Sequence, residues 1–487
     1  MPSSKLIIDY FAGGGGASTG IESFFGRPVD IAINHCHDAI DMHKKNHPNT
    51  KHYCEDVWDV DPVEACQGKP IGFGWFSPNC THYSKARAGK PVDKRIRGLA
   101  WIILKWAGVV ELEQWACENV TEFRTWGPLM LNDKGESIPD PARAGETYDA
   151  FIKCLTTGLD DAHPAWPEIH EFLGPDYPYK KLKQGLGYNL EYRTLVMSDY
   201  GVPTTRERLF IYARKDGCTV QWPTPSHGPV GSGLLPVRTA AEIIDWSIPT
   251  KSIFGRKKAL APSTLRRIAL GLKNIAFSDD KMFIVPPELL PDSPITSCYS
   301  PEHEQDVITV SHIAKHYTGV TGSSLREPLH TVTATDHNAL VTCNIVKFRG
   351  DNVGHSLNEP LQTISAGGNH FAEVRAYLVK FFGTATAAEL TKPLGSITTR
   401  DRYALVTIHG DLYQIVDIGM RMLEPHELYA AMGFPANYQF QFNTKGIKNT
   451  KQNQVARCGN AVCPTMAELL VKANFTYRTD KTLKHAA

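Results

Sequence analysis

A short apolar segment that runs into four consecutive glycines is the feature that most restricts the fold. Residues 5–11, Lys-Leu-Ile-Ile-Asp-Tyr-Phe, are followed after Ala12 by residues 13–16, Gly-Gly-Gly-Gly, and residues 17–25 then have a helical composition. This order predicts a buried strand, a tight turn and a helix. Glycines in such a turn let a ligand approach the backbone where the helix begins. A tight turn at the sheet edge without a ligand is the alternative.

The glycine run does not fit the common nucleotide-binding patterns. When a G-x-G-x-x-G pattern is counted from Gly13 or Gly14, its last position falls on Ser18 or Thr19. The run also lacks the Gly-Lys-Ser/Thr ending of a phosphate-binding P-loop. Both observations argue against a dinucleotide and against ATP.

The first 215 residues alternate between expected strands and helices. Further strands are expected at residues 29–33, 71–76, 115–117, 190–197 and 209–213, and helices at 38–46 and 99–112. Strands separated by helices indicate an α/β fold with a doubly wound, mostly parallel, Rossmann-like sheet. Residues 121–186 are rich in proline, glycine and charge, and we expect them to be an insertion over one edge of that sheet.

After about residue 215 the sequence changes character and an internal repeat appears. Leu-Arg-Glu-Pro-Leu-His-Thr-Val-Thr at residues 325–333 recurs at 357–365 and 390–398, and Ala-Leu-Val-Thr of residues 339–342 returns at 404–407. A fixed period predicts one supersecondary unit copied and stacked. The Pro-Leu-x-Thr-Ile-Thr core is alternating and β-branched, which predicts a strand leaving a proline turn. We therefore expect a second, irregular β-rich domain over residues 216–415.

The composition supports more than one domain and excludes several classes of protein. The chain has 487 residues, of which 42% are hydrophobic and 21% charged, so it can bury more than one core. No apolar stretch approaches the ~18 residues of a membrane-spanning helix, and no secretory signal is expected. The eleven cysteines form no C-x-x-C pair, which favours a reducing cytoplasmic compartment without structural disulfides. The net charge of +1 neither requires nor forbids a nucleic-acid partner.

Reactive side chains follow or begin several of the expected strands. Cys80 follows one strand in a Pro-Asn-Cys loop, Glu118 ends the next, and Arg206 and Arg208 lie on one face at the start of another. Taken alone, each has an ordinary alternative, such as a buried inert thiol or a surface carboxylate. His82, two residues beyond Cys80, leaves a cysteine hydrolase open, although no orienting third group is evident.

In their order along the chain, these segments resemble the DNA cytosine-C5 methyltransferase family. The glycine-rich turn, the Pro-x-Cys loop, Glu-Asn-Val at 118–120 and Arg-x-Arg at 206–208 follow the family order, and residues 421–435 and 459–464 look like its last two blocks. The sequence around Cys80 is most similar to bacterial and phage members. The resemblance implies a catalytic domain over residues 1–215, completed by residues 416–487, and a target-recognition domain over 216–415.

The resemblance also implies a role for each segment. Cys80 would attack C6 of a cytosine flipped out of the duplex, and Glu118 would hold the N3 edge and the exocyclic amine. Arg208 would hold O2, and Arg206 would help to position the catalytic loop. S-adenosylmethionine would supply the methyl group to C5, with no metal. The expected contacts of this donor are Phe11, Ala12, Gly13, Gly15, Gly16, Asn34, His35, Asp56, Val57, Pro78, Asn460 and Ala461.

Three positions depart from the family pattern. Asn34 replaces the usual ribose-binding glutamate, Asn79 replaces a proline before Cys80, and Thr204 replaces a glutamine ahead of the two arginines. None of these changes removes a catalytic group. They leave open how tightly the chain binds the methyl donor and whether it uses a different donor.

The implied activity is sequence-specific methylation of cytosine C5 in double-stranded DNA. Residues 246–278, with seven Lys or Arg and no acidic residue, would bind phosphates, while the repeats would read base edges. A structural scaffold is the alternative for the repeats. A DNA-binding protein without catalysis and an RNA cytosine-5 methyltransferase also remain open. We expect a monomer in the cytoplasm of a bacterial cell, encoded by chromosome or phage, with a restriction endonuclease as an open partner.

Overall fold

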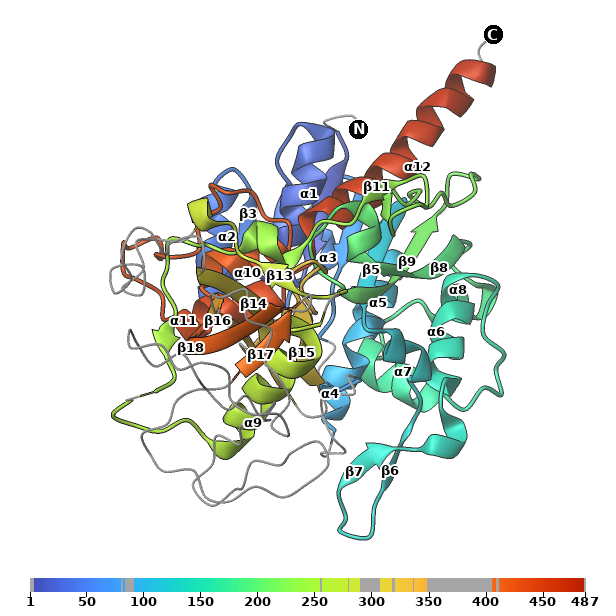
Figure 1. Cartoon of the computed structure of the whole chain (residues 1–487). Coiled ribbons are helices and arrows are strands. Elements are labelled where there is room, and N and C mark those ends of the chain that lie inside the picture. Colours follow the sequence, from blue (N-terminus) through green and yellow to red (C-terminus); the bar gives the residue numbers. More distant parts are fainter. Residues whose placement is uncertain are drawn as a thin grey trace, which may run out of the picture. The chain divides into compact units, whose positions relative to one another are not determined.

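The computed structural model divides the chain into two compact units (Figure 1). One unit comprises Met1–Arg238, His330–Thr335 and Leu428–Ala487, and the other Thr239–Leu329 and Asp336–Glu427. Within them, the structure describes residues 4–79, 82–83, 92–254, 256–278, 280–289, 307–317, 320–335, 337–347, 405–408 and 411–485.

A seven-stranded sheet forms the centre of the first unit. Its strand order is β3 (Lys51–Tyr53), β2 (Ile31–Ile33), β1 (Leu6–Tyr10), β4 (Ile71–Phe76), β5 (Gln114–Asn119), β9 (Glu207–Arg214) and β8 (Asn189–Val196). The pairs from β3 to β5 are parallel, and β9 is antiparallel to both of its neighbours. The predicted α/β class with a doubly wound, mostly parallel sheet is confirmed.

Helices connect these strands. They are α1 (Gly16–Phe25), α2 (His37–Asn46), α3 (Pro62–Cys66), α4 (Lys94–Arg97) and α5 (Ile102–Val109). All five residues of β1 are buried, as expected for a central strand covered on both faces. The helix expected at 99–112 is shorter, because Gly98–Trp101 is a 3₁₀ turn and α5 ends at Val109.

The C-terminal segment of the chain returns to the first unit. It contributes α10 (Pro425–Ala431, mostly in this unit), α11 (Lys451–Gly459) and α12 (Pro464–His485). α12 packs closely on α1, since a Cβ atom at Gly20 would lie 2.0 Å from the carbonyl oxygen of Pro464. The chain rejoins this unit at Leu428 rather than at residue 416, which lies inside strand β18 of the other unit.

Residues 121–186 pack into the main core, which their expected role as an insertion over an edge did not anticipate. They form α6 (Glu146–Leu155), α7 (Trp166–Leu173), α8 (Tyr179–Gln184) and a hairpin of β6 (Leu129–Leu131) with β7 (Ser137–Pro139). Phe151 and Ile169 are fully buried in the same cluster as Trp101 and Trp115. The segment is therefore mainly the connection from β5 to β8, and the hairpin exposes Met130 and Leu131. A small pair of strands, β10 (His227–Gly228) and β11 (Leu235–Pro236), follows β9.

The second unit is built on an antiparallel sheet, which agrees with the expected β-rich domain. Its strand order is β12 (Lys251–Ser252), β18 (Asp411–Met422), β16 (Asn338–Lys347), β14 (Val307–Tyr317) and β13 (Phe283–Ile284). β15 (Val320–Ser324) pairs with β14, and β17 (Leu405–Ile408) pairs with β18. Helix α9 (Pro262–Gly271) packs on this sheet, since Ile268 shares a core with Val310, Val341 and Ile418.

The first copy of the repeat is only partly a strand. Its Ala-Leu-Val-Thr segment lies in β16, and the equivalent Leu405 lies in β17. The strand expected after Pro328 is wrong, because residues 330–333 are in neither strand nor helix. The buried residues of this copy are Leu325, Pro328, Leu329 and Val332, and their spacing of three, one and three does not match the period of two of a strand. The copies at 357–365 and 390–398 lie outside the described residues.

Within the part of the chain that the structure describes, no helix is long and apolar enough to cross a membrane. In the same residues all nine cysteines are free thiols, and no cluster of side chains could hold a metal ion.

Candidate active site

The glycine run forms a tight turn between β1 and α1. Phe11, Gly13 and Gly15 have positive φ angles of 63°, 49° and 80°. For a phenylalanine this backbone conformation is strained and rare, and such strain concentrates at functional sites. The N–H of Gly15 donates to the carbonyl of Ala12 at 2.8 Å, and the N–H of Ala12 donates to that of Ile33 at 3.0 Å. The turn is thus joined to the end of β2.

Neighbouring atoms crowd the positions where Gly14, Gly15 and Gly16 would carry a Cβ atom, whereas the same position at Gly13 is not crowded. A Cβ atom at Gly14 would lie 2.8 Å from Met42 Cε, and one at Gly16 would lie 2.0 Å from the carbonyl oxygen of Val462. At Gly13 the nearest atom would be the carbonyl oxygen of Phe11 at 3.5 Å. Space therefore remains in front of Gly13 for a ligand to approach the backbone. This arrangement fits the predicted methyl-donor site.

A buried polar chain lies behind the turn. The Ser18 hydroxyl donates to Asp9 Oδ2 at 2.7 Å, and His43 Nε2 lies 3.0 Å from the same hydroxyl. His43 Nδ1 lies 2.8 Å from His52 Nε2. Burial raises the pKa of Asp9 to about 7 and lowers the pKa of His43 well below its usual value. Burial also lowers the pKa of His52 to about 4. Both imidazoles are therefore neutral at pH 7.

A second set of contacts holds the turn directly. Glu22 Oε2 lies 2.8 Å from His47 Nδ1, and His47 Nε2 lies 3.4 Å from the Thr19 hydroxyl. That hydroxyl donates to the Gly15 carbonyl at 2.7 Å. The hydroxyl of Tyr438 donates to the carbonyl of Gly14. Motif reasoning missed all of these residues, since no local pattern in the sequence links them to the turn.

The other expected donor contacts lie along the same edge of the sheet. The N–H of Asn34 donates to the carbonyl of Tyr53 at 3.1 Å, which joins the ends of β2 and β3. Asn34 Oδ1 accepts the N–H of Cys36 at 2.8 Å, and Asp56 Oδ1 accepts that of Trp58 at 3.1 Å. The side chains of Asn34 and Asp56 thus stabilise their own loops through hydrogen bonds to the backbone. His35 and Asn460 are exposed, whereas Val57 and Pro78 are buried.

Ala461 also lies beside the turn, since its Cβ would be 3.9 Å from a Cβ at Gly14. The structure therefore brings the N-terminal turn and the C-terminal block at 459–464 together, as the resemblance implies.

Glu118 lies near the end of β5 between the two arginines. Its Oε1 atom is 3.0 Å from Arg208 Nε and 3.6 Å from Arg206 Nη2, and its side chain is 11% exposed. Despite these ion pairs, Oε1 is buried and accepts no hydrogen bond from the residues that the structure describes. A buried acceptor of this kind costs free energy unless a ligand satisfies it. The three residues predicted to act together are thus found together.

Arg206 binds backbone carbonyls of segments that are distant in the sequence. Its guanidinium donates to the carbonyls of Val332 at 3.3 Å, Gly459 at 3.0 Å and Ala461 at 3.1 Å. The residue is 3% exposed. Among the described residues it therefore connects the start of β9 to two distant segments, and its predicted contact with the loop that contains Cys80 lies outside those residues.

Cys80 lies outside the described residues. On the described side of it, Asn119 Nδ2 donates to the carbonyl of Pro78 at 3.1 Å. This bond joins the end of β4 to the residue that follows Glu118. His82 Nδ1 accepts the N–H of Asp93 at 3.0 Å, so this ring nitrogen has a structural role, which weakens the hydrolase alternative.

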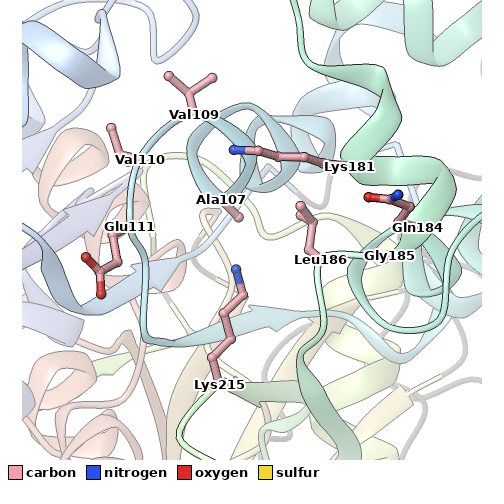
Figure 2. A pocket seen from close by; sticks show the side chains of 9 residues that line it. All are labelled: Ala107, Val109, Val110, Glu111, Lys181, Gln184, Gly185, Leu186 and Lys215. Atoms are coloured by element: carbon pink, nitrogen blue, oxygen red, sulfur yellow. The ribbon is translucent and has the colours of Figure 1, made fainter.

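A cavity of about 350 Å³ lies near the ends of the strands that face away from the glycine turn (Figure 2). It is lined by Lys181, Lys215 and Glu111 among others. Glu111 precedes β5 and Lys215 follows the antiparallel β9, so the cavity is near the amino ends of the parallel strands. Ligands of open α/β sheets bind outside the carboxyl ends, and the cavity is therefore separate from the candidate site.

Comparisons with known proteins bear on the class of the protein as a whole. No family model matches the chain. It is 25% identical over 240 residues to the type II methyltransferase M.SacI of Streptomyces achromogenes and 24% identical over 257 residues to the type II methyltransferase M.AquIA of a Picosynechococcus species. The alignments cover 45% and 49% of this chain, and 50% and 88% of those proteins. The chain thus spans half the length of the first relative. A solved mutant of Spodoptera frugiperda DNMT2 aligns over 97% of this chain and 99% of its own, at 14% identity with a TM-score of 0.44.

The mostly parallel sheet and the open glycine turn fit the methyltransferase fold that the resemblance implies. The similarity to two type II methyltransferases supports the resemblance to the DNA methyltransferases.

Proposed function

We propose that this chain transfers a methyl group from S-adenosylmethionine to C5 of cytosine in double-stranded DNA. The observation that supports the proposal is the buried Glu118 Oε1, which lies between Arg206 and Arg208 and accepts no hydrogen bond from any described residue. The exocyclic amine of cytosine is a donor that would satisfy this atom. Thymine has a carbonyl at the same position, so it would place an acceptor against an acceptor.

The reaction that we propose uses the thiol of Cys80, the carboxyl of Glu118 and the guanidinium of Arg208. The Cys80 thiolate forms a bond to C6, and the electron pair moves onto the ring as Glu118 protonates N3. Arg208 would stabilise the charge on O2, a kind of support worth about 3 kcal/mol per group. The electron-rich C5 then takes the methyl group, and the methyl–sulfur bond of the donor breaks to leave S-adenosylhomocysteine. Loss of the C5 proton to water, return of the N3 proton to Glu118 and expulsion of the Cys80 thiolate restore the neutral aromatic ring.

The methyl donor would be held at the glycine turn. S-adenosylmethionine supplies an electrophilic methyl group attached to a sulfonium. The open backbone at Gly13 would admit its polar end, and the Phe11 ring would stack on the adenine. Asp56 would accept from the adenine amine. Asn34 would give the ribose a neutral hydrogen bond.

Basic residues of the second unit support a DNA substrate. Lys257, Lys258 and Arg266 are exposed and would contact phosphates, which position the duplex without specifying a sequence. Arg256 has another role, because its guanidinium binds the carbonyls of Ser252 at 2.8 Å and Lys251 at 3.0 Å. The two sequence relatives are named type II methyltransferases, which supports a role beside a restriction endonuclease. We propose the bacterial cytoplasm as the site of action, with the chain acting as a monomer.

Expression in a bacterial host that lacks cytosine methylation tests the proposal. Mass spectrometry of the host nucleosides is expected to detect 5-methylcytosine in DNA, and none in DNA from cells that express Cys80→Ser. Duplexes that carry 5-fluorocytosine should trap the parent chain covalently, and Cys80→Ser should escape trapping. Parallel labelling of transfer RNA separates the RNA alternative. Methylation of adenine, of the cytosine amine or of RNA alone would contradict the proposal.

A further inference from the structure

Another pocket, of about 530 Å³, lies beside the edge strand β8. Its walls come from Thr121–Thr125, a 3₁₀ helix that follows β5, from α6 and from Tyr192 of β8. All of these residues belong to the first unit, and none of them belongs to the proposed catalytic or methyl-donor sites. The volume is that of an ordinary small-molecule site.

The pocket is separate from the carboxyl group of Glu118. The strand register pairs Tyr192 with Ile211, and Ile211 with Cys117. Paired residues point to the same face of a sheet, and successive residues along a strand point to opposite faces. Tyr192 therefore shares a face with Cys117, whereas Glu118 points to the other face. A base held by Glu118 would leave this pocket unoccupied.

Tyr148 contributes a buried hydroxyl without a partner to the lining of the pocket. The residue is 7% exposed, and its hydroxyl oxygen has no hydrogen-bond partner among the described residues. The rings of Phe123 and Tyr192 pack against it, with centroids 5.5 and 6.1 Å away. Burial raises the pKa of this phenol, so the hydroxyl keeps its proton at neutral pH. A buried donor of this kind costs free energy unless a ligand offers an acceptor.

Arg124 adds an exposed positive charge to the same pocket. Its guanidinium lies over the Tyr192 ring, with Cζ 4.9 Å from the ring centroid. In the part of the chain that the structure describes, no hydrogen bond or ion pair occupies its N–H groups. A guanidinium that stacks on an aromatic ring still directs its N–H groups outward from its edge, where they can bind a phosphate or a carboxylate.

These groups together fit a nucleoside phosphate. The phosphate would accept from Arg124, and the base would stack on the ring of Tyr192, which is 40% exposed. A sugar or base oxygen would accept from Tyr148. Asp149 is the acidic residue of the lining, and its Oδ2 atom lies 2.7 Å from Lys153 Nζ. This ion pair offsets the negative charge, and the carboxylate could accept from a sugar hydroxyl or a base amine.

We infer that this pocket binds a nucleoside phosphate, either free or as one unit of a nucleic-acid strand, and that Arg124, Tyr148 and Tyr192 are its contacts. The inference does not depend on the proposed function, because the pocket and Glu118 lie on different faces of the sheet. If Tyr148 had only a packing role, a phenylalanine would fill the same space without leaving a buried hydroxyl unpaired.

Calorimetric titration of the full chain with thymidine 5′-monophosphate tests the inference. This probe has neither the adenine of the methyl donor nor the amine that would bind Glu118, so it is not expected to enter those sites. We expect the parent chain to bind it more tightly than inorganic phosphate alone. Arg124→Gln should weaken binding about 10-fold or more, and Tyr148→Phe about fivefold.

A matched control and a stability measurement separate binding from folding. Arg193→Gln is the control, because Arg193 lies over the Trp222 ring, with Cζ 5.2 Å from its centroid, and does not line the pocket. This variant should bind the nucleotide as the parent does. Tyr148→Phe should leave the thermal unfolding midpoint of the free chain unchanged or raise it, since the variant loses an unpaired buried hydroxyl.

A single-stranded oligothymidylate distinguishes the two sources of the ligand. If it binds more tightly than the mononucleotide, and through the same two residues, the ligand is a nucleic-acid strand. If the mononucleotide binds and the oligonucleotide does not, the ligand is a free nucleotide. Either result supports the inference.

Several results would overturn the inference. Binding of neither probe to the parent chain is decisive against it. Equal affinities of the parent, Arg124→Gln and Tyr148→Phe, or an equal loss in Arg193→Gln, would place any binding elsewhere. Phosphate that binds as tightly as the nucleotide would exclude recognition of a nucleoside. A lower unfolding midpoint for Tyr148→Phe would show that the hydroxyl stabilises the free chain rather than a ligand.

Discussion

Tyr438 donates its hydroxyl hydrogen to the carbonyl of Gly14, which lies 424 positions earlier in the chain. The same hydroxyl would be 2.5 Å from a Cβ atom at Gly15. The C-terminal segment therefore fixes the shape of the turn that we assign to the methyl donor. Because the turn is nearly all glycine, its shape depends on such external contacts more than on its own side chains.

Replacement of Tyr438 by phenylalanine removes this hydrogen bond and keeps the ring. A hydrogen bond of this kind contributes about 1 kcal/mol, so we expect about fivefold weaker binding of S-adenosylhomocysteine by calorimetric titration. Tyr429→Phe is the matched control, because Tyr429 stacks near Tyr438 while its hydroxyl contacts only the Met42 sulfur among the described residues. Equal affinities for the two variants would show that Tyr438 does not hold the turn.

Gly15→Ala is expected to damage the donor site through both strain and overlap. The φ angle of 80° disfavours a side chain, and the new Cβ would meet Tyr438 and His47 at 2.5 and 2.9 Å. Gly26→Ala separates the two causes, since Gly26 has a φ of 64° and no neighbour within 4 Å of the added atom. Strain alone costs about 1–2 kcal/mol. We expect Gly26→Ala to lower the unfolding free energy by that amount and to bind the methyl donor as the parent does. We expect Gly15→Ala to lose binding of the methyl donor.

The parts of the site that the sequence predicted are those set by strand geometry. Glu118 and the two arginines come together because β5 pairs with β9, which contains Arg208 and begins directly after Arg206. The period of two predicted that the two arginines share a face, whereas their closeness to Glu118 was implied by the family resemblance. Local sequence patterns also placed the glycine turn correctly, since an apolar strand that runs into glycines leaves few alternatives.

The parts that could not be predicted depend on contacts between distant segments. Nothing near Gly14 indicates Tyr438, and nothing near Arg206 indicates the carbonyls of Val332 and Ala461. The strand predicted after Pro328 was wrong because its alternation of β-branched residues competes with burial at a different spacing. Residues 121–186 appeared polar overall, although Phe151 and Ile169 occupy the main core.

The polar chain behind the turn predicts a specific pH dependence. The pKa of Asp9 is raised from 3.8 to about 7, so the folded chain keeps a proton that the unfolded chain releases, and this stabilisation is lost as the pH rises through that window. His43 and His52 act oppositely, because their lowered pKa values destabilise the folded chain as the pH falls below 6.5. Asp9 therefore offsets part of the acid sensitivity that the histidines cause.

Asp9→Asn removes the carboxyl group's contribution and retains an oxygen that can accept from Ser18. Relative to the parent, the unfolding free energy of the variant should increase between pH 4 and pH 7 by up to about 4 kcal/mol. Urea unfolding at a series of pH values measures it. Asp161→Asn is the control, since the Asp161 side chain is 74% exposed. Its difference in unfolding free energy from the parent should not change with pH. A flat difference for Asp9→Asn would show that Asp9 is not protonated in the folded chain.

Arg206→Lys tests the connection among three segments. A lysine keeps the charge, but its single ammonium group cannot reach three carbonyls in the fixed geometry of a guanidinium. Leaving buried carbonyls without a donor costs about 1–3 kcal/mol each, so the unfolding midpoint should fall clearly. Arg193→Lys is the control, since Arg193 stacks on the Trp222 ring at the surface, and it should change the midpoint little. A midpoint for Arg206→Lys equal to that of the control would contradict the assignment.

Glu118→Gln tests the chemistry most directly. Glutamine has the same shape and can still bind a ring edge, but it cannot give a proton to N3, so the thiol would attack a less electron-poor ring. We expect kcat for methyl transfer to fall about 100- to 1,000-fold, with donor binding unchanged. Glu113→Gln is the matched control, because Glu113 lies just before the other end of the same strand and pairs with Lys5. A Glu118→Gln chain as fast as Glu113→Gln would rule out a proton donor at this position, and the carboxyl would then serve only to recognise the base.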